Sequence, residues 1–489
     1  MNRLKILPLR DDSLKSKLLE LKRTFETSYG PSGKLKLFAE QSGEQSYGSS
    51  STLFLRSVVN LYEDDPVIKL LFTNTKEHLK NYKDFGLFCS FTCLSLLHSG
   101  LTTDVPASVV TQCYEKFLCE ISDFISSSAL SFDVSSLTSF TKLLNGVIWT
   151  KPTLKLTVNE VETWSMQMLK ACIKQMPCKG WRPSNPLPAI TYQQSALKQN
   201  PQVFDGVILE LYHYTASDLH DICAVVSVKQ NRRVMVINLT QIADSQTEMF
   251  KNSTKSEVNK FSENETKKFL QKIVGCKISI LFSQRIVSDE IKKFLSEQSV
   301  TVIDRIGRDA IDSVKDITRC KIIEYFCEEP IHCISTIDDI REITFNGKSY
   351  ILLTNSSIPM CSIIVFYSNP AIEHDVRHIC TAALHTFWQT VNSQKVLPGG
   401  GKLEIEIARN LRRIYSNQNT HTDIPCTKSQ FLICLENFCS VFDHIGHMLH
   451  DSPNNCPVIQ DCYTSKYNAI MVAVQTACMV LGIQFHITD

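Results

Sequence analysis

Two segments with helical spacing are joined by the run Val396-Leu397-Pro398-Gly399-Gly400-Gly401-Lys402-Leu403-Glu404. Consecutive glycines allow the backbone to take positive φ angles and to approach a ligand closely. The amides that open the helix beginning at Leu403 carry the positive end of the helix dipole, so they can bind an anion. A second glycine turn, Tyr29-Gly30-Pro31-Ser32-Gly33-Lys34, lies near the N-terminus. One such turn is weak evidence for a phosphate site, and the second strengthens it.

The composition is that of an ordinary globular protein. The chain has 489 residues, of which 43% are hydrophobic and 21% charged, and its formal net charge is +1. This balance gives no overall field that would attract nucleic acid or an anionic membrane. The sequence shows no signal peptide and no apolar run long enough to span a bilayer, so we expect no membrane insertion and a soluble cytoplasmic protein. The nineteen cysteines are scattered without a C-x-x-C pair, which favours reduced thiols.

The pattern along the chain predicts a mixed α/β block inserted into a helical chain. Residues up to about 190 and residues after 370 have mostly helical spacing, so these flanks must fold together. Between them, short β-branched runs alternate with helices, which is typical of a parallel sheet. The predicted strands are 206–211, 224–226, 233–237, 277–282, 300–303, 321–326, 349–354 and 362–366. The polar segment 245–268 has few apolar residues and is predicted to be a protrusion or a mobile loop.

The two glycine turns, together with the C-terminal run Lys466-Tyr467-Asn468-Ala469-Ile470, resemble the group II chaperonin (TCP-1) family. The turns are similar to its GPxGxxK and VPGGGxxE motifs, and the resemblance covers nearly the whole chain. Within the family, Asp84-Phe85-Gly86-Leu87-Phe88 and Thr381-Ala382-Ala383-Leu384-His385 resemble the divergent chaperonin-like branch associated with the McKusick–Kaufman and Bardet–Biedl syndromes.

This resemblance implies an α/β multidomain chaperonin subunit fold. It has a helical equatorial domain that faces the nucleotide, a hinge-like intermediate domain, and an inserted α/β apical domain. The implied ranges are 1–130 and 398–489 for the equatorial domain, 131–195 and 371–397 for the intermediate domain, and 196–370 for the apical domain. In the family, apical helices corresponding to 289–297 and 309–317 form the client groove.

The same resemblance places the nucleotide site, and the sequence departs from it at the groups that do chemistry. The residues implied to face a nucleotide are Gly30, Pro31, Gly33, Asp84, Gly86, Gly399, Gly400, Gly401 and Asp461. Serines at 49–51 replace the family's NDG turn, and Phe85 replaces the first glycine after the aspartate of its GDGTT turn. The hydrolytic aspartate position is Ala382, whose methyl group cannot orient water. We therefore expect no catalytic residue, no metal site, no required cofactor, and at most weak ATP or ADP binding.

Some of these residues also have plain structural explanations. Asp84 could be a helix N-cap, Asp461 could be a surface acid, and Asp375 lies about two helical turns from Ala382. Cys439, Asp443 and His447 share one helix face, but three ligands over two turns of one helix diverge too far to close a zinc tetrahedron. A solvated polar face is the favoured interpretation of that row.

The expected function is therefore that of a chaperonin-like protein that binds other proteins without ATP hydrolysis. The resemblance implies that it assists assembly of the ciliary Bardet–Biedl coat complex, with sibling chaperonin-like proteins and cytosolic chaperonin subunits as partners, at the centrosome or basal body. The alternatives are an active ATP-dependent chaperonin subunit and a structural centrosomal protein. Strands at the two chain ends, 4–7 and 483–487, are expected to offer free edges for docking.

Overall fold

The structure is a computed structural model that describes most of the chain. The described residues are 5–8, 12–30, 32–39, 43, 45–62, 65–149, 154–177, 185–228, 232–239, 256–325, 328–416, 424–450 and 459–488. The chain divides into two compact units, of which the first combines Met1–Leu169 with Tyr367–Asp489 and the second is Lys170–Phe366. The finer division into three domains remains a prediction.

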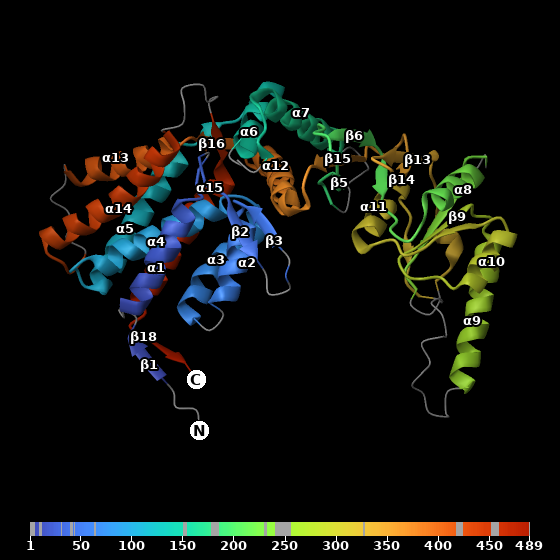
Figure 1. Ribbon diagram of the computed structural model, residues 1–489, viewed down its shortest axis with the longest axis horizontal. Coiled ribbons are helices and arrows are strands. Elements are labelled where there is room, and N and C mark those ends of the chain that lie inside the picture. Colours follow the sequence, from blue (N-terminus) through green and yellow to red (C-terminus); the bar gives the residue numbers. More distant parts are fainter. Residues whose placement is uncertain are drawn as a thin grey trace. The chain divides into compact units, whose positions relative to one another are not determined.

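The first unit is a helical assembly around α4. Its principal elements are β1 (Lys5–Pro8), α1 (Asp12–Glu26), β2 (Lys36–Ala39), β3 (Gln45–Gly48), α2 (Ser51–Leu61), α3 (Pro66–Tyr82), α4 (Gly86–Thr102), α5 (Ala107–Ser127), β4 (Leu130–Ser131), α6 (Leu137–Trp149), α12 (Glu373–Ser393), β16 (Lys395–Pro398), α13 (Lys402–Ser416), α14 (Lys428–His450), β17 (Gln460–Cys462), α15 (Tyr463–Gly482) and β18 (Phe485–Thr488). Helix α4 is buried around most of its circumference, as expected for a helix that is apolar on every side. It packs against α1, α3, α14 and α15 (Figure 1).

Small sheets in this unit bring distant segments together. Strand β16, which precedes the triple-glycine turn, pairs with β4 on one side and β17 on the other. The hairpin of β2 and β3 was not predicted, because its four-residue strands carry little apolar alternation. The chain-end strands were predicted with free edges, but β1 and β18 pair with each other in an antiparallel ribbon, so each has one edge already used.

The second unit is the predicted α/β block, and α7 (Val158–Lys174) leads into it. Its elements are β5 (Ala189–Gln194), β6 (Gln202–Asp205), β7 (Val207–Leu209), α8 (Ala216–Ser227), β8 (Arg233–Ile237), α9 (Ser256–Gly275), β9 (Ile280–Ser283), α10 (Asp289–Glu297), β10 (Thr301–Ile303), α11 (Arg308–Thr318), β11 (Ile322–Ile323), β12 (Ile334–Thr336), β13 (Asp339–Phe345), β14 (Lys348–Thr354) and β15 (Cys361–Tyr367). Strands β10, β9, β8 and β11 form a parallel sheet, which β12 joins antiparallel at β8.

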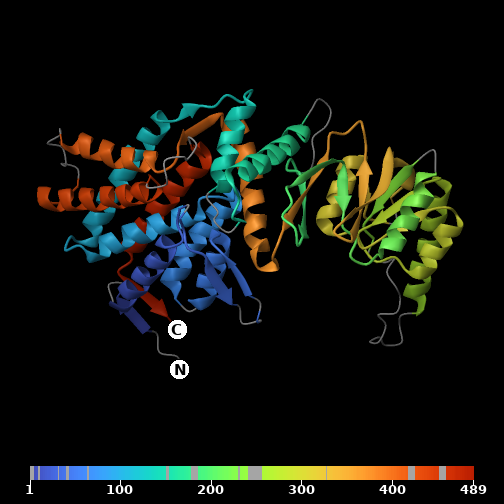
Figure 2. The ribbon, with the colours of Figure 1, turned by 45° about the horizontal axis from the view of Figure 1, so that its top comes forward.

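Both faces of this sheet are covered. Val234 and Val236 of β8 belong to a core with α8 and α11. Met235 and Ile237, which point the other way, belong to a core with α9 and α10. Figures 1 and 2 show α10 and α11 on opposite sides of the sheet. A parallel strand buried on both faces accounts for the unbroken apolar run at 234–237.

One strand prediction for this unit was wrong. Residues 224–226 are not a strand but the end of α8, which begins with a capping box between Thr215 and Asp218 and buries Leu219, Cys223 and Val226 at helical spacing. The run of β-branched residues is too short to show the helical spacing of these buried residues. The segment 245–268 was predicted to be a protrusion or a mobile loop. Its part from Ser256 onward is the start of α9 and so is not an irregular loop; residues 245–255 lie outside the described part.

Two further expectations can be compared with the structure. Among the described residues, none of the helices combines the length and apolarity that a membrane span requires. The described cysteines are all free thiols.

Candidate functional site

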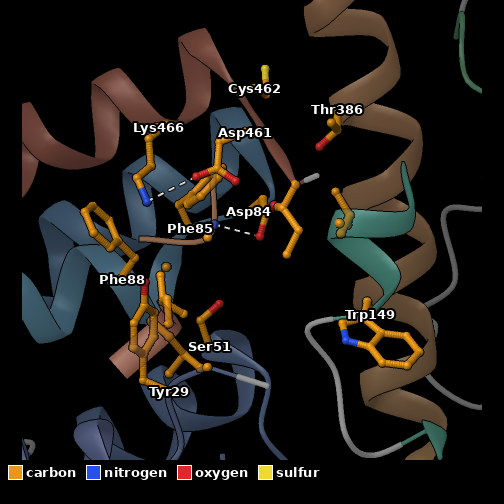
Figure 3. Close-up of a pocket in the computed structure, with 18 of the residues that line it drawn as sticks. Tyr29, Ser51, Asp84, Phe85, Phe88, Trp149, Thr386, Asp461, Cys462 and Lys466 are labelled. Carbon is orange, nitrogen blue, oxygen red and sulfur yellow. Dashed lines mark hydrogen bonds and ion pairs between the residues drawn. The ribbon is translucent and has the colours of Figure 1, made fainter. Parts of the chain in front are cut away.

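A pocket in the first unit lies between the two glycine turns. It has a volume of about 120 Å³. Figure 3 shows Asp84 and Ser51 on one side of the open space and Thr386 and Trp149 on the other. Its described lining comes from separate parts of the chain: Ser28, Tyr29, Gly30, Ser49, Ser51, Asp84, Phe85, Gly86, Leu87, Phe88, Leu143, Gly146, Val147, Trp149, Thr386, Gly400, Leu449, Ile459, Gln460, Asp461, Cys462 and Lys466.

The glycine turns have the tight geometry that their sequences predict. Gly401 has a φ of 81°, and a Cβ atom there would lie 2.1 Å from the carbonyl oxygen of Gly446 on α14. A Cβ atom on Gly33 would lie 2.4 Å from the carbonyl oxygen of Ser28. Neither position can accept a side chain, so both turns are fixed by packing whether or not a ligand binds.

A buried ion pair lies at the inner end of the pocket. Lys466 of α15 is 1% exposed and faces the carboxylate of Glu404, which is 0% exposed. Its ammonium group is also 3.4 Å from Asp461, and 3.9 Å from the ring centroid of Phe88 and 5.0 Å from that of Phe85. Aromatic faces and carboxylates together stabilise a positive charge away from water.

Negative charges outnumber positive charges in the group around Lys466. Burial raises the pKa of Asp461 to about 6; Lys466 acts to lower it, while the carboxylates of Glu404 and Asp84 raise it further. Burial acts to lower the pKa of Lys466, but Glu404 and Asp461 raise it well above its usual range. Two carboxylates therefore flank the Lys466 ammonium group, and a third, that of Asp84, acts on Asp461.

Asp84 stands at the aspartate of the turn that resembles the family's GDGTT motif, and it makes backbone contacts within that turn. Its carboxylate accepts the backbone N–H of Phe85 at 2.8 Å, and its carbonyl oxygen lies 2.9 Å from Nε2 of His78. Phe85 adopts a left-handed conformation, with φ of 59°, and directly precedes α4. Asp84 is therefore not the side-chain cap of α4. The ring of Phe85 lines the pocket at a position where the family has glycine.

The turn before α2 already holds a carboxylate from within the chain. Asp375 of α12 is fully buried, and its two oxygens accept the backbone N–H groups of Ser49 at 2.9 Å and Ser50 at 3.2 Å. A Cβ atom on Gly48 would lie 2.4 Å from both of these oxygens. These two amides belong to the serine turn that precedes α2, which stands where the family has its NDG turn, and Asp375 occupies both of them.

The neighbouring positions on α12 carry no acid toward the pocket. Ala382 is fully buried and does not line it, whereas Thr386, one turn further, does. Among the described residues, the hydroxyl groups of Thr386 and Ser49 have no hydrogen-bond partner, and each residue is only 2% exposed.

The structure brings most of the predicted site residues together. Gly30, Asp84, Gly86, Gly400 and Asp461 line the pocket, while Gly33, Gly399 and Gly401 shape the turns beside it. Pro31 lies outside the described residues. Asp461 is not a surface acid, because its side chain is 16% exposed on strand β17.

Sequence reasoning missed several residues of the site. These are Lys466 and Glu404 as an ion pair, Asp375 as a ligand of amides, and Thr386 as a pocket residue. No signal in the sequence pointed to these contacts, since even Asp375 is one of two acids in the first turn of α12, where acidic residues are ordinary.

The residues of the possible zinc site on α14 make other contacts. Cys439 is fully buried with its thiol 3.6 Å from the carbonyl oxygen of Ala408, so this part of the row is not a solvated face. Asp443 accepts a hydrogen bond at 2.6 Å from Arg412. Within the described ranges, no group of three or more His, Cys, Asp or Glu side chains is arranged to hold a metal ion.

The second unit has an open groove of about 440 Å³ beside a buried acid. Asp304 is 2% exposed and accepts hydrogen bonds from Tyr214 at 2.7 Å and from the amide of Val287 at 3.0 Å, and Lys292 of α10 lies 3.0 Å away. Burial acts to raise the pKa of Asp304, but these donors lower it below its usual value. Lys292 therefore has a structural partner, whereas Lys293 beside it is exposed.

Comparison with known proteins gives a consistent picture. The model of the TCP-1/cpn60 chaperonin family matches residues 21–430. The chain is 22% identical over 463 residues to the protein named Molecular chaperone MKKS from Mus musculus, covering 91% of this chain and 79% of that protein. It is 20% identical to T-complex protein 1 subunit alpha of Encephalitozoon cuniculi (82% and 75% covered) and 18% identical to thermosome subunit alpha of Sulfurisphaera tokodaii (82% and 73% covered). The chain therefore belongs to the TCP-1/cpn60 chaperonin family, as its glycine turns and its inserted α/β unit predicted.

Proposed function

We propose that this chain is a chaperonin-like protein that binds other proteins and does not hydrolyse ATP. We further propose that it assists assembly of the ciliary Bardet–Biedl coat complex, with sibling chaperonin-like proteins and cytosolic chaperonin subunits, at the centrosome or basal body. Family membership supports the general part of this proposal, namely interaction with other chaperonin subunits or with client proteins.

The observation that carries the proposal is Asp375. Its carboxylate accepts the backbone N–H groups of Ser49 and Ser50, in the turn that precedes α2, at 2.9 and 3.2 Å. A phosphate could use these amides only by displacing a fully buried side chain. The displaced carboxylate would add a negative charge beside the phosphates, in a pocket that already contains Asp84 and Asp461.

The active-subunit alternative requires groups that the pocket lacks. Phosphoryl transfer needs a residue that orients the attacking water, and the residue at that position is Ala382. The pocket volume of about 120 Å³ is also well below the roughly 300–1,000 Å³ of typical ligand pockets. The preserved glycine turns support weak nucleotide binding at most, because packing alone explains their shape.

Client binding is assigned to the outer faces of α10 and α11 by analogy with the family. Lys292 is unsuitable as a probe of these faces, because its substitution would also expose the buried Asp304. Lys293 is the matched choice, since it is adjacent, exposed and on the same helix.

The experiment is affinity isolation of the tagged chain from ciliated cells, followed by identification of the bound proteins. We expect chaperonin-like siblings, cytosolic chaperonin subunits and Bardet–Biedl coat subunits. Lys293→Glu should reduce the bound clients and leave the chaperonin partners unchanged. Recovery of a homo-oligomeric ring without any of these partners would contradict the proposal.

The paired chain ends provide a second test of partner binding. Deleting residues 1–12 or residues 483–489 should weaken association with chaperonin partners to a similar extent, because β1 and β18 form one ribbon and each deletion removes the partner of the other strand. Unchanged association after both deletions would rule out the ribbon as a docking element.

A further inference from the structure

The remodelled pocket has a chemistry of its own. Asp84 lines it without an ion-pair partner among the described residues, and the one recorded hydrogen bond to its carboxylate comes from the amide of Phe85. The charge of Lys466 is already matched by Glu404 and Asp461. The open part of the pocket therefore has an excess of negative charge, which disfavours an anion and favours a cation.

Two residues of the pocket lining carry buried hydroxyl groups that have no hydrogen-bond partner in the described part of the chain. These residues are Ser49 and Thr386, each 2% exposed, and Figure 3 shows the Thr386 hydroxyl directed toward the pocket. A buried polar atom without a hydrogen bond costs free energy, so such atoms point to a ligand or to ordered water. With a carboxylate beside them, these oxygens can accept hydrogen bonds from a ligand with several N–H donors.

The remaining wall of the pocket is apolar and the space is small. Leu143 and Val147 of α6, with Ile459, provide aliphatic surface in its lining. An apolar cavity of about 150 Å³ holds benzene, so a pocket of about 120 Å³ accommodates a compound of roughly five heavy atoms. The required ligand thus has a cationic donor group at one end and a short hydrocarbon at the other.

We propose that this pocket binds a small primary alkylammonium compound. Asp84, Ser49 and Thr386 would accept hydrogen bonds from the ammonium group, and the aliphatic wall would contact its alkyl chain. The pocket's inner end already stabilises one primary ammonium group, that of Lys466, with carboxylates and aromatic rings. The inference rests on the proposed absence of ATP turnover, because it assigns the same pocket a different ligand.

The test uses two probes that differ in one group. Binding of n-butylamine and of butan-1-ol to the full chain is measured by titration calorimetry at constant ionic strength. We expect saturable binding of the amine and at least tenfold weaker binding of the alcohol, because a charge-assisted hydrogen bond to Asp84 is lost. Equal affinities, or no binding of the amine, would overturn the proposal.

Two variants identify the site. Asp84→Asn should weaken amine binding at least tenfold. Thr386→Val keeps the shape of the side chain, removes the unpartnered hydroxyl group, and should weaken amine binding while the protein remains folded. Unchanged amine affinity in folded Thr386→Val and Asp84→Asn proteins would overturn the assignment to this pocket. Phosphate release from ATP is measured in the same samples; turnover would contradict the proposed function, whereas missing amine binding alone would contradict only this inference.

Discussion

Asp461 in the first unit and Asp304 in the second are both nearly buried carboxylates beside a lysine, yet their pKa values move in opposite directions. Asp304 is 3.0 Å from Lys292 and its pKa is lowered. Asp461 is 3.4 Å from Lys466 and burial raises its pKa to about 6. The difference lies in the other neighbours, since Asp304 accepts hydrogen bonds from an amide and a phenol, whereas Asp461 faces two further carboxylates.

This contrast separates an ion pair whose charge is matched by its neighbours from a group with unmatched negative charge. The donors around Asp304 compensate its negative charge. Asp304 therefore links β10 to α10 without leaving an unpaired buried charge. Around Asp461, the carboxylates of Glu404, Asp461 and Asp84 outnumber the single ammonium group of Lys466. Perturbed groups in a pocket are typical of binding sites.

The largest expected effect follows from removing the central cation of the first unit. Lys466→Met leaves Glu404 and Asp461 buried without their partner, which should lower the free energy of unfolding by about 3–5 kcal/mol. Chemical denaturation followed by tryptophan fluorescence measures this change. The exposed Lys402→Met is the matched control and should change stability by less than about 0.5 kcal/mol. Equal stability of both variants would show that the ion pair does not support the unit.

Asp461 should also make stability depend on pH. Its pKa is raised in the folded protein from its ordinary value of 3.8 to about 6, so between these values the folded state binds more protons than the unfolded state. Its contribution is therefore fully present below about pH 4 and is lost as the pH rises through 6. A shift of about 2 units corresponds to about 3 kcal/mol.

The measurement compares the wild type with Asp461→Asn over pH 4 to 7. The melting temperature of the wild type should fall, relative to the variant, as the pH rises. A constant difference across this range would mean that Asp461 ionises normally.

Substitution of Asp304 should differ from substitution of Asp461 in the size of the stability loss and in its dependence on pH. Asp304→Asn loses charge-assisted hydrogen bonds to Lys292 and to the Val287 amide, at a cost of about 2–3 kcal/mol in the free energy of unfolding of the second unit. Because the pKa of Asp304 is lowered, its stabilising effect is present above its ordinary value and is lost only as the pH falls below that value. Thermal unfolding should therefore show the same wild-type-to-variant difference at pH 5 and pH 7. A difference that changes between these two pH values would remove the contrast with Asp461.

The smallest effect is expected at Asp375. Asp375→Asn keeps one acceptor oxygen but places a donor against the second serine amide, which should cost about 1–2 kcal/mol. Hydrogen exchange at the amides of Ser49 and Ser50 should become faster, while exchange in α4 remains unchanged. Unaltered exchange at the two serines would show that the carboxylate does not hold this turn.

Much of the fold could be predicted from local patterns, and the site could be predicted only in part. The parallel sheet follows from apolar runs such as 234–237, because strands buried on both faces need them. Glycine-rich turns can be recognised from their composition, so the glycines that line the pocket could be located from the sequence. The segment 224–226 was mistaken for a strand, because three residues do not show whether the period is 2 or 3.6.

The missed interactions join residues far apart in sequence. Asp375 reaches Ser49 across 326 positions, and Lys466 reaches Glu404 through the pairing of β16 with β17 and the packing of α15. A single sequence carries no signal for either partner. Asp375 was judged only by its spacing from Ala382 on the same helix, and its actual partner lies on another element.

The most direct test of the central proposal is ATP turnover by the purified full-length chain, followed as phosphate release with Mg²⁺ present. We expect no release above background from the wild type, and none from Ala382→Asp, because Asp375 still occupies the Ser49 and Ser50 amides and Phe85 still lines the pocket. Steady turnover by the wild type that is lost in Asp84→Asn would contradict the proposal and identify an active chaperonin subunit.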